Sequence, residues 1–418
     1  MSKKKLFCSC VIWMIIFCML LSVVSELANN QAFALETVPL GRTETAETAE
    51  TAEMAEMTEM AGRVETAETA EGVAIATAEI NVSQASETSG NSLALYNGEV
   101  IHLFTHCLVA NPDIAFRVSN DMAVHYDADC LVASEFKKIL TLLYENNYVL
   151  CDIRDTYEII DGKAKKKAFL FPEGKKPLVL SFDDVVYDPN KSGKGMADRL
   201  VIENGKIGAE TFGAGISFDN EFVCILESFI QSHPDFSFEG ARGIMCLTGF
   251  SGILGYRTQE GSENRESEIS KAKEVVAFLK NSGWQFASHS FAHGHMKSVS
   301  DEKFASDVSK WKNQVESIVG ETDLYVYPYG EWVISENVNG ENVTSEKHKA
   351  LVNAGFKVFL GVGTKPFYSY LPFSGDDKYL FMDRCSLDGV TLRSESGVID
   401  NYFDPKLVID EGVRGRRE

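Results

Sequence analysis

Short apolar runs alternate with amphipathic segments from residue 99 to about residue 383, and this alternation restricts the possible folds more than any other feature. We predict strands at residues 100–105, 148–153, 177–182, 243–247, 284–288, 324–327, 356–361 and 378–383, and helices at residues 135–146, 221–231, 266–281, 301–319 and 345–354. Strands joined by helices pair in parallel, because the helical connection returns the chain to the same end of the sheet. We therefore predict an α/β fold, a distorted (β/α) barrel of about seven parallel strands, over residues 93–391.

The first 34 residues have the pattern of an export signal. Three lysines, Lys3 to Lys5, precede an apolar run from Leu6 to Val24, and Ala32-Phe33-Ala34 matches a signal peptidase cleavage motif. The run is also long enough to span a bilayer. Two alternatives therefore stay open, cleavage with secretion or a retained anchor at residues 6–24, and both predict an extracellular or cell-surface protein.

Residues 35–92 form a low-complexity linker in which Glu-Thr-Ala recurs every three residues. A period of three builds no single apolar helical face, so we predict a disordered stalk. The whole chain carries a net charge of −21, which repels phosphate backbones and argues against a nucleic-acid partner. The sequence indicates no role for the C-terminal extension, residues 392–418. It also does not predict an oligomeric state.

The cysteines do not form a metal-binding or redox motif. Six lie beyond the export signal, none of them in a C-x-x-C pattern, and several occupy apolar runs. We expect buried thiols, such as Cys151 and Cys246, although an even number in an exported chain also permits disulfides.

Polar clusters follow directly on three of the predicted strands. Asp183-Asp184 follows PLVLSF, the HSFAH segment with His289 and His293 follows WQFAS, and Pro328-Tyr329-Gly330 follows LYVY. Taken singly, each is a common loop, helix-face or turn pattern. The carboxyl ends of parallel barrel strands share one face, however, and active sites are found there. Two imidazoles with one carboxylate would make a metal site with open positions for water, and a second carboxylate would supply a base.

The order of these clusters resembles the polysaccharide deacetylase (NodB-homology) family. SFDD is similar to the family's TFDDG motif, HSFAH to its H-[ST]-x-x-H motif, and YVYPYG to its R-x-P-Y-G motif. The strand VIHLFTH, which ends at His106, is similar to the N-terminal strand of exported poly-N-acetylglucosamine deacetylases. The resemblance covers roughly residues 95–385.

The resemblance implies a role for six residues. Asp184, His289 and His293 would bind a divalent metal, Asp183 would be the catalytic base, the Tyr329 N–H would help to stabilise the oxyanion, and His106 would be the general acid. Two positions depart from the family pattern, since Val185 replaces a glycine and Val326 replaces an arginine that orients the base. Arg384 either takes over that role in space or is an ordinary surface arginine.

The implied activity is metal-dependent hydrolysis of the acetamide of an acetylated amino-sugar polysaccharide, with zinc as the first choice of metal and cobalt, manganese or nickel also suited to the ligands. Two alternatives remain, a carbohydrate O-acetyl esterase using the same site and a non-catalytic glycan-binding relative. His295 is a rival metal ligand. Four aromatic residues are candidates for stacking on sugar rings, with core or rim packing as the alternative for each: Tyr327, Tyr329, Trp332 and Trp284.

Overall fold

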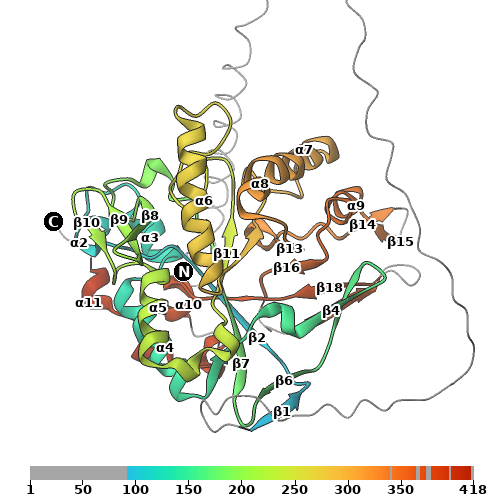
Figure 1. Ribbon diagram of the computed structural model, residues 1–418, viewed down its shortest axis with the longest axis horizontal. Helices are drawn as coiled ribbons and strands as arrows, with labels where there is room; N and C mark the ends of the chain where they lie inside the picture. The colour runs from blue at the N-terminus through green and yellow to red at the C-terminus, as the bar shows by residue number, and fades with distance from the viewer. Residues whose placement is uncertain (1–91, 339–340, 364–367, 373–377, 395–396, 416–418) are drawn as a thin grey trace, which may run out of the picture. The chain divides into compact units, whose positions relative to one another are not determined.

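The computed structural model describes residues 92–338, 341–363, 368–372, 378–394 and 397–415. Eight parallel strands occupy seven positions around a common centre, because the last two along the chain share one position. In sheet order the strands are β18 (Lys378–Met382), β16 (Val358–Leu360), β13 (Leu324–Val326), β12 (Gln285–Ser288), β11 (Ile244–Leu247), β7 (Lys176–Asp183), β2 (Ile101–His106) and β19 (Cys385–Ser386). These strands and the helices around them are drawn in Figure 1.

The ring closes because one segment of chain pairs with both ends of the sheet. β18 is bonded in parallel to β16, and β19, which begins only three positions after β18 ends, is bonded in parallel to β2. The chain bends between them at Asp383 and Arg384. The predicted barrel of about seven parallel strands is thereby confirmed, and the irregular closure makes it distorted.

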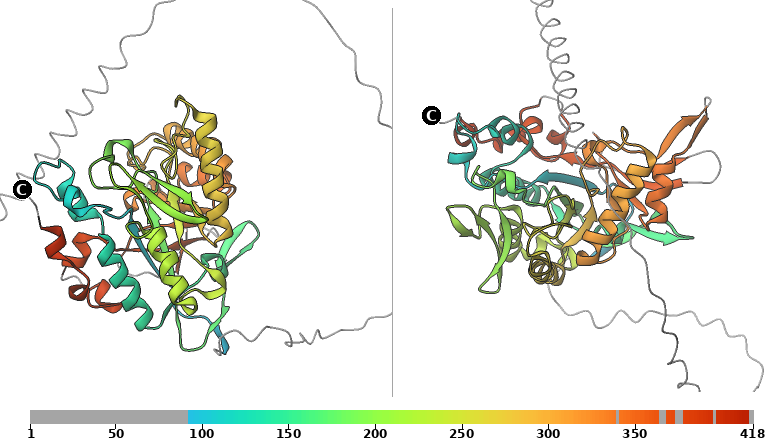
Figure 2. Two further views of the ribbon diagram at one scale, coloured as in Figure 1. Left: turned by 60° about the vertical axis from the view of Figure 1, so that its left-hand side comes forward. Right: turned by 90° about the horizontal axis from the view of Figure 1, so that it is seen from above.

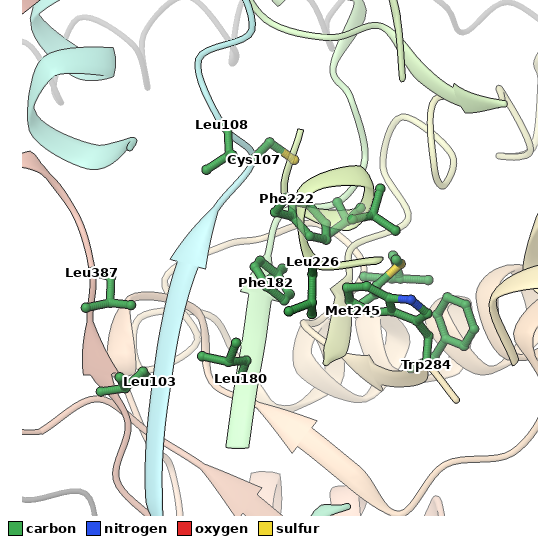
Figure 3. Close-up of a cluster of buried hydrophobic side chains, with 14 of the residues drawn as sticks. Leu103, Cys107, Leu108, Leu180, Phe182, Phe222, Leu226, Met245, Trp284 and Leu387 are labelled. Carbon is green, nitrogen blue, oxygen red and sulfur yellow. The ribbon is translucent and has the colours of Figure 1, made fainter. Parts of the chain in front are cut away.

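Alternate residues of each strand face the two sides of the barrel wall. In β7, Leu180 and Phe182 pack outward against the helices, whereas Val179 packs into the barrel with residues of the other strands. Phe182 stacks on Phe222 of helix α5 with ring centroids 3.9 Å apart. Figure 3 shows this outer core, with Leu226 beside the same rings. Because both faces are buried, these strands are continuous apolar runs in the sequence.

Helices cover the outside of the barrel and fill the connections between its strands. They are α2 (Pro112–Ala115), α3 (Ala123–Asp129), α4 (Ala133–Glu145), α5 (Phe222–Ser232), α6 (Arg265–Asn281), α7 (Asp301–Trp311), α8 (Ser317–Val319), α9 (Glu346–Asn353), α10 (Gly389–Arg393) and α11 (Glu411–Arg414). The five predicted helices correspond to α4, α5, α6, α7 with α8, and α9.

Further short strands either pair with barrel strands or form small separate sheets. β3 (Tyr148–Leu150) pairs with the start of β7, and β17 (Tyr368–Pro372) pairs antiparallel with β18. Hairpins or small sheets are formed by β1 (Leu93–Tyr96) with β6 (Phe169–Pro172), β4 (Tyr157–Ile160) with β5 (Lys163–Lys166), β14 (Ser335–Val338) with β15 (Glu341–Thr344), and β8 (Arg199–Glu203) with β9 (Lys206–Thr211) and β10 (Gly215–Ser217). Asn204 and Gly205 form the turn of the β8–β9 hairpin, both with positive φ. Figure 2 gives two further views.

The expected export segment and stalk lie outside the described residues. None of the helices in the described part of the chain combines the length and apolar character that a membrane crossing requires. The six cysteines beyond the export signal are all buried free thiols, as expected from their apolar surroundings. The expected domain boundary at residue 391 falls inside α10, and C-terminal residues such as Leu392, Phe403 and Val408 belong to the main core.

Candidate active site

The predicted site residues line a single cavity at the carboxyl ends of the barrel strands. His106 ends β2, Asp183 ends β7, His289 directly follows β12, and Tyr329 follows β13 by three positions. All four line a cavity of about 530 Å³, together with Asp184 and His293. His106 and Asp183 are also neighbours in the sheet register. Parallel pairing is therefore what gathers residues from four distant parts of the sequence.

Three of these side chains are arranged as a metal site. One ligand atom from each of Asp184, His289 and His293 lies within 4.8 Å of the other two. The Nδ1 of His289 is 3.1 Å from the backbone carbonyl of Val326, which leaves Nε2 free to bind a cation. Asp184 Oδ1 is buried and has no hydrogen-bond partner among the described residues, although His293 Nε2 lies 3.5 Å away. An unpaired buried carboxylate oxygen beside two imidazoles fits a divalent transition metal.

The backbone turns sharply at two of the three ligands. Asp184 has a φ of 57° and His293 a φ of 51°, both in the left-handed region. At Asp184 the turn separates two adjacent carboxylates, because Asp183 is still in the strand and Asp184 is not. Burial of His293 lowers its pKa to about 4, so its ring is neutral at pH 7, which is the form that binds metal.

A carboxylate that the sequence analysis missed holds the HSFAH loop. The two oxygens of Asp307, on α7, accept hydrogen bonds of 2.8 Å from the N–H groups of Phe291 and Ala292. The N–H of His293 donates to the Ser290 hydroxyl at 2.9 Å. Burial raises the pKa of Asp307. A signal was present in the sequence, since Asp307 lies on the apolar stripe of α7, between Phe304 and Val308.

Arg384 forms an ion pair with the predicted base. Its Nη1 and Nη2 atoms donate to Asp183 Oδ1 and Oδ2 at 2.7 and 2.9 Å, and Nη1 also reaches the Ser181 hydroxyl at 3.1 Å. The Arg384 side chain is fully buried, so of the two alternatives the surface arginine is wrong. Burial acts to raise the pKa of Asp183, but Arg384 and His289 more than offset this effect and hold that pKa well below its usual range.

The remaining predicted residues surround the possible metal position. His106 Nδ1 is bonded to the Asp129 carbonyl at 2.9 Å. Tyr329 has a φ of 57°, and its hydroxyl is 3.2 Å from His293 Nδ1. The rival ligand His295 is not in the cluster, because its Nδ1 pairs with Glu331 at 3.1 Å and its ring stacks on Tyr329.

The aromatic candidates divide by exposure. The Tyr329 and Trp332 side chains are exposed, and stacking on a sugar ring stays a prediction for both. Tyr327 is fully buried beside Phe359 and Phe381, which is the core alternative. Trp284 is buried in the outer core, where its Nε1 donates to Glu227, so the core alternative is confirmed for it.

A comparison with family models places part of this site in a known family. Residues 259–347 match the polysaccharide deacetylase model, and this stretch contains both histidines of the cluster and the Pro328–Gly330 turn. This stretch of the chain is similar to the polysaccharide deacetylase family. The resemblance drawn from the motifs is thereby confirmed, and Asp183, Asp184 and Arg384 complete the site from outside the matched stretch. No curated protein matches the chain in sequence.

Several solved structures of deacetylases are similar to this chain. The deacetylase PplD of Streptococcus pyogenes, in complex with acetate, is 13% identical over 70% of this chain and 93% of its own, with a TM-score of 0.39. A polysaccharide deacetylase from Bacillus cereus is 12% identical over 73% and 69%, with a TM-score of 0.39. The BpsB deacetylase domain of Bordetella bronchiseptica is 12% identical over 70% and 98%, with a TM-score of 0.35. All three TM-scores are below 0.5.

Proposed function

We propose that the protein is an exported, metal-dependent carbohydrate N-deacetylase that removes acetyl groups from N-acetylglucosamine-type residues of a cell-wall or matrix polysaccharide. One observation carries the proposal: the Asp184, His289 and His293 cluster shares a cavity with Asp183. The family match supports a hydrolase acting on acetylated polysaccharide. The export signal within residues 1–34 supports a cell-surface or extracellular location.

Each side chain supplies a function that amide hydrolysis needs. Asp184, His289 and His293 would hold a divalent ion, with zinc our first choice, which would lower the pKa of a bound water and polarise the acetamide carbonyl. Asp183 accepts the water proton, and Arg384 keeps that carboxylate ionised and fixed in orientation. The N–H of Tyr329 donates to the developing oxyanion. His106 then protonates the departing amine, which is a poor leaving group without a proton.

The environment of Asp183 favours catalysis over the non-catalytic alternative. Without an arginine beside it, burial would raise the pKa of this carboxylate, and a protonated base cannot accept the water proton. Arg384 supplies that guanidinium from a different part of the sequence than the family motif. This arrangement supports an active hydrolase. Activity on N-acetylated as against O-acetylated polymers distinguishes the amidase from the esterase alternative.

The test combines metal analysis with acetate release from acetylated chitooligosaccharide, peptidoglycan, poly-N-acetylglucosamine and an O-acetylated xylan. We expect about one divalent metal ion per chain and acetate release from at least one N-acetylated polymer. Asp183→Asn is expected to keep the metal and to lose activity about 10²- to 10⁴-fold, as expected for a lost general base. Asp184→Asn is expected to lose metal as well.

Two results would contradict the proposal. Release from the O-acetylated polymer alone would replace the amidase with an esterase. Full acetate release by both aspartate variants would show that the reaction takes place elsewhere.

A further inference from the structure

The wall of the cavity beside His106 is formed by the chain between α3 and α4. α3 ends at Asp129, and the carbonyl groups of a last helical turn have no donor to bind within the helix. Here these carbonyls and those just beyond them have partners from other parts of the molecule. His106 Nδ1 is 2.9 Å from the carbonyl of Asp129, and the N–H of Val109 donates to that of Leu131 at 2.9 Å. The His106 ring is thus oriented by the end of α3.

Arg414, near the end of the described chain, binds the carbonyl groups on both sides of this contact. Its Nη1 donates to Asp127 O at 2.9 Å, and its Nη2 donates to Cys130 O at 2.8 Å. The Arg414 side chain is fully buried and also pairs through two bonds of 2.7 Å with Glu135, which is fully buried on α4. Asp129, the acceptor for His106, therefore lies between two carbonyl groups that one guanidinium fixes.

Other C-terminal residues reinforce the same contact. Glu135 accepts the N–H of Asp410 at 3.0 Å, which joins the start of α11 to α4. Gly389, at the start of α10, packs so closely that an added Cβ would lie 1.9 Å from Asp127 O and 2.8 Å from Arg414 Nη1. In Figures 1 and 2 the C-terminal helices, in red, lie beside α3 and α4, in cyan to teal. We name these contacts of Gly389, Asp410 and Arg414 with α3 and α4 the C-terminal clamp.

We infer that the C-terminal clamp fixes the end of α3 so that His106 is held in position for proton donation, and that Arg414 is a positioning residue for the reaction. This inference depends on the proposed deacetylase function. The Asp129 carbonyl is the one hydrogen-bond partner of the His106 ring in the described part of the chain. No carboxylate there orients the ring, so its orientation is only as rigid as the backbone that supplies this carbonyl.

The test compares two matched pairs of residues. Glu135→Gln with Arg414→Met removes the guanidinium without leaving a buried carboxylate unpaired, and the introduced amide oxygen can still accept from the N–H of Asp410. Glu227→Gln with Arg242→Met is the control, because Arg242 likewise bonds both oxygens of one glutamate and two backbone carbonyls, but away from the cavity. Arg414→Lys is a milder change to the clamp, for the case in which the first double variant does not fold.

The readouts are kcat and KM on an acetylated chitooligosaccharide and on 4-nitrophenyl acetate, together with metal content. The phenolate leaves without a proton, so only the amide reaction needs the acid. We expect the clamp variant to lose about 10- to 100-fold in kcat on the amide, as for a misplaced catalytic group, and less than about threefold on the ester. Metal content should be unchanged, and the control variant should match the unmodified protein on both substrates. An equal loss on both substrates, or no loss on the amide, would overturn the inference.

A second readout does not depend on activity. In ¹⁵N-histidine NMR, the Nδ1–H of His106 should give a slowly exchanging signal in the unmodified and control proteins, and this signal should be lost in the clamp variant. Its persistence in the clamp variant would refute the positioning role. An unmodified protein that shows the signal but releases no acetate would instead contradict the proposed function alone.

Discussion

Replacing Arg384 with methionine should be among the most damaging single changes to the barrel. The substitution preserves much of the side chain's length but removes four hydrogen bonds, to the two oxygens of Asp183, to the Ser181 hydroxyl and to the carbonyl of Gly361. The Asp183 side chain is only 4% exposed. After the change, no arginine or lysine remains in an ion pair with it among the described residues, and the Nε2 of His289 lies 3.8 Å from Asp183 Oδ2.

The expected loss follows from the buried charge that remains. Breaking a buried ion pair from one side costs about 3–5 kcal/mol, because the other charge stays desolvated and unpaired. We expect the free energy of unfolding of the metal-free protein to fall by about this amount at pH 7. The pKa of Asp183 is held below its usual range, so the pair stabilises the folded state above the ordinary aspartate pKa of about 4 and this contribution is lost as the pH falls below it.

The assay is a double-mutant cycle in which urea unfolding measures the free energy of unfolding of each metal-free protein. Asp183→Asn with Arg384→Met removes both charges, so it should recover at least about 2 kcal/mol relative to Arg384→Met alone. Acetate release by Arg384→Met with bound metal should also fall, because the orientation of the base is lost. Additive effects of the two substitutions on unfolding, or a loss below about 1 kcal/mol for Arg384→Met, would refute the reasoning.

Three further outcomes are expected. Asp307→Ala should weaken metal binding about tenfold or more, since two N–H groups of the HSFAH loop lose their acceptor; unchanged affinity in a metal titration would contradict this. Burial raises the pKa of Glu221 to about 8, so the folded state binds this proton more tightly than the unfolded state. The free energy of unfolding should therefore fall by up to about 1.4 kcal/mol per pH unit as the pH rises from about 4.5 to 8. Glu221→Gln should remove this slope. Deletion of residues 36–92 should leave kcat on a soluble substrate unchanged, because that segment has no apolar pattern able to fold, and a large fall would assign it to the site.

The sequence was sufficient for the strands and for the polar residues at their ends. Strand and helix periodicities are local properties, and parallel pairing then brings the ends of β7, β12 and β13 to one face without further information. The adjacency of Asp183 and Asp184 and the spacing of His289 and His293 are equally local. These patterns predicted the cluster that the structure assembles.

The same local rules explain why Tyr327 belongs to the core. Tyr327 directly precedes the Pro328–Gly330 turn, and this nearness made it a candidate for stacking on sugar rings. Strand periodicity, however, sends Tyr325 and Tyr327 to the helix-covered side of the wall and Val326 to the barrel interior. The two-residue period of the strand therefore predicts which side of the barrel wall Tyr327 faces, whereas nearness to a motif in the sequence does not.

The partners of the site residues were decided only by the tertiary structure. Arg384 lies 201 positions from Asp183, and the ion pair exists because β18 and β19 close the ring with that arginine at the bend between them. The end of α3 likewise meets Arg414 from 284 positions away, whereas its contact with His106 spans only 23 positions. Local periodicity determines where strands and helices form and which faces they bury. It does not determine which buried charge meets which, because that depends on how distant elements pack together.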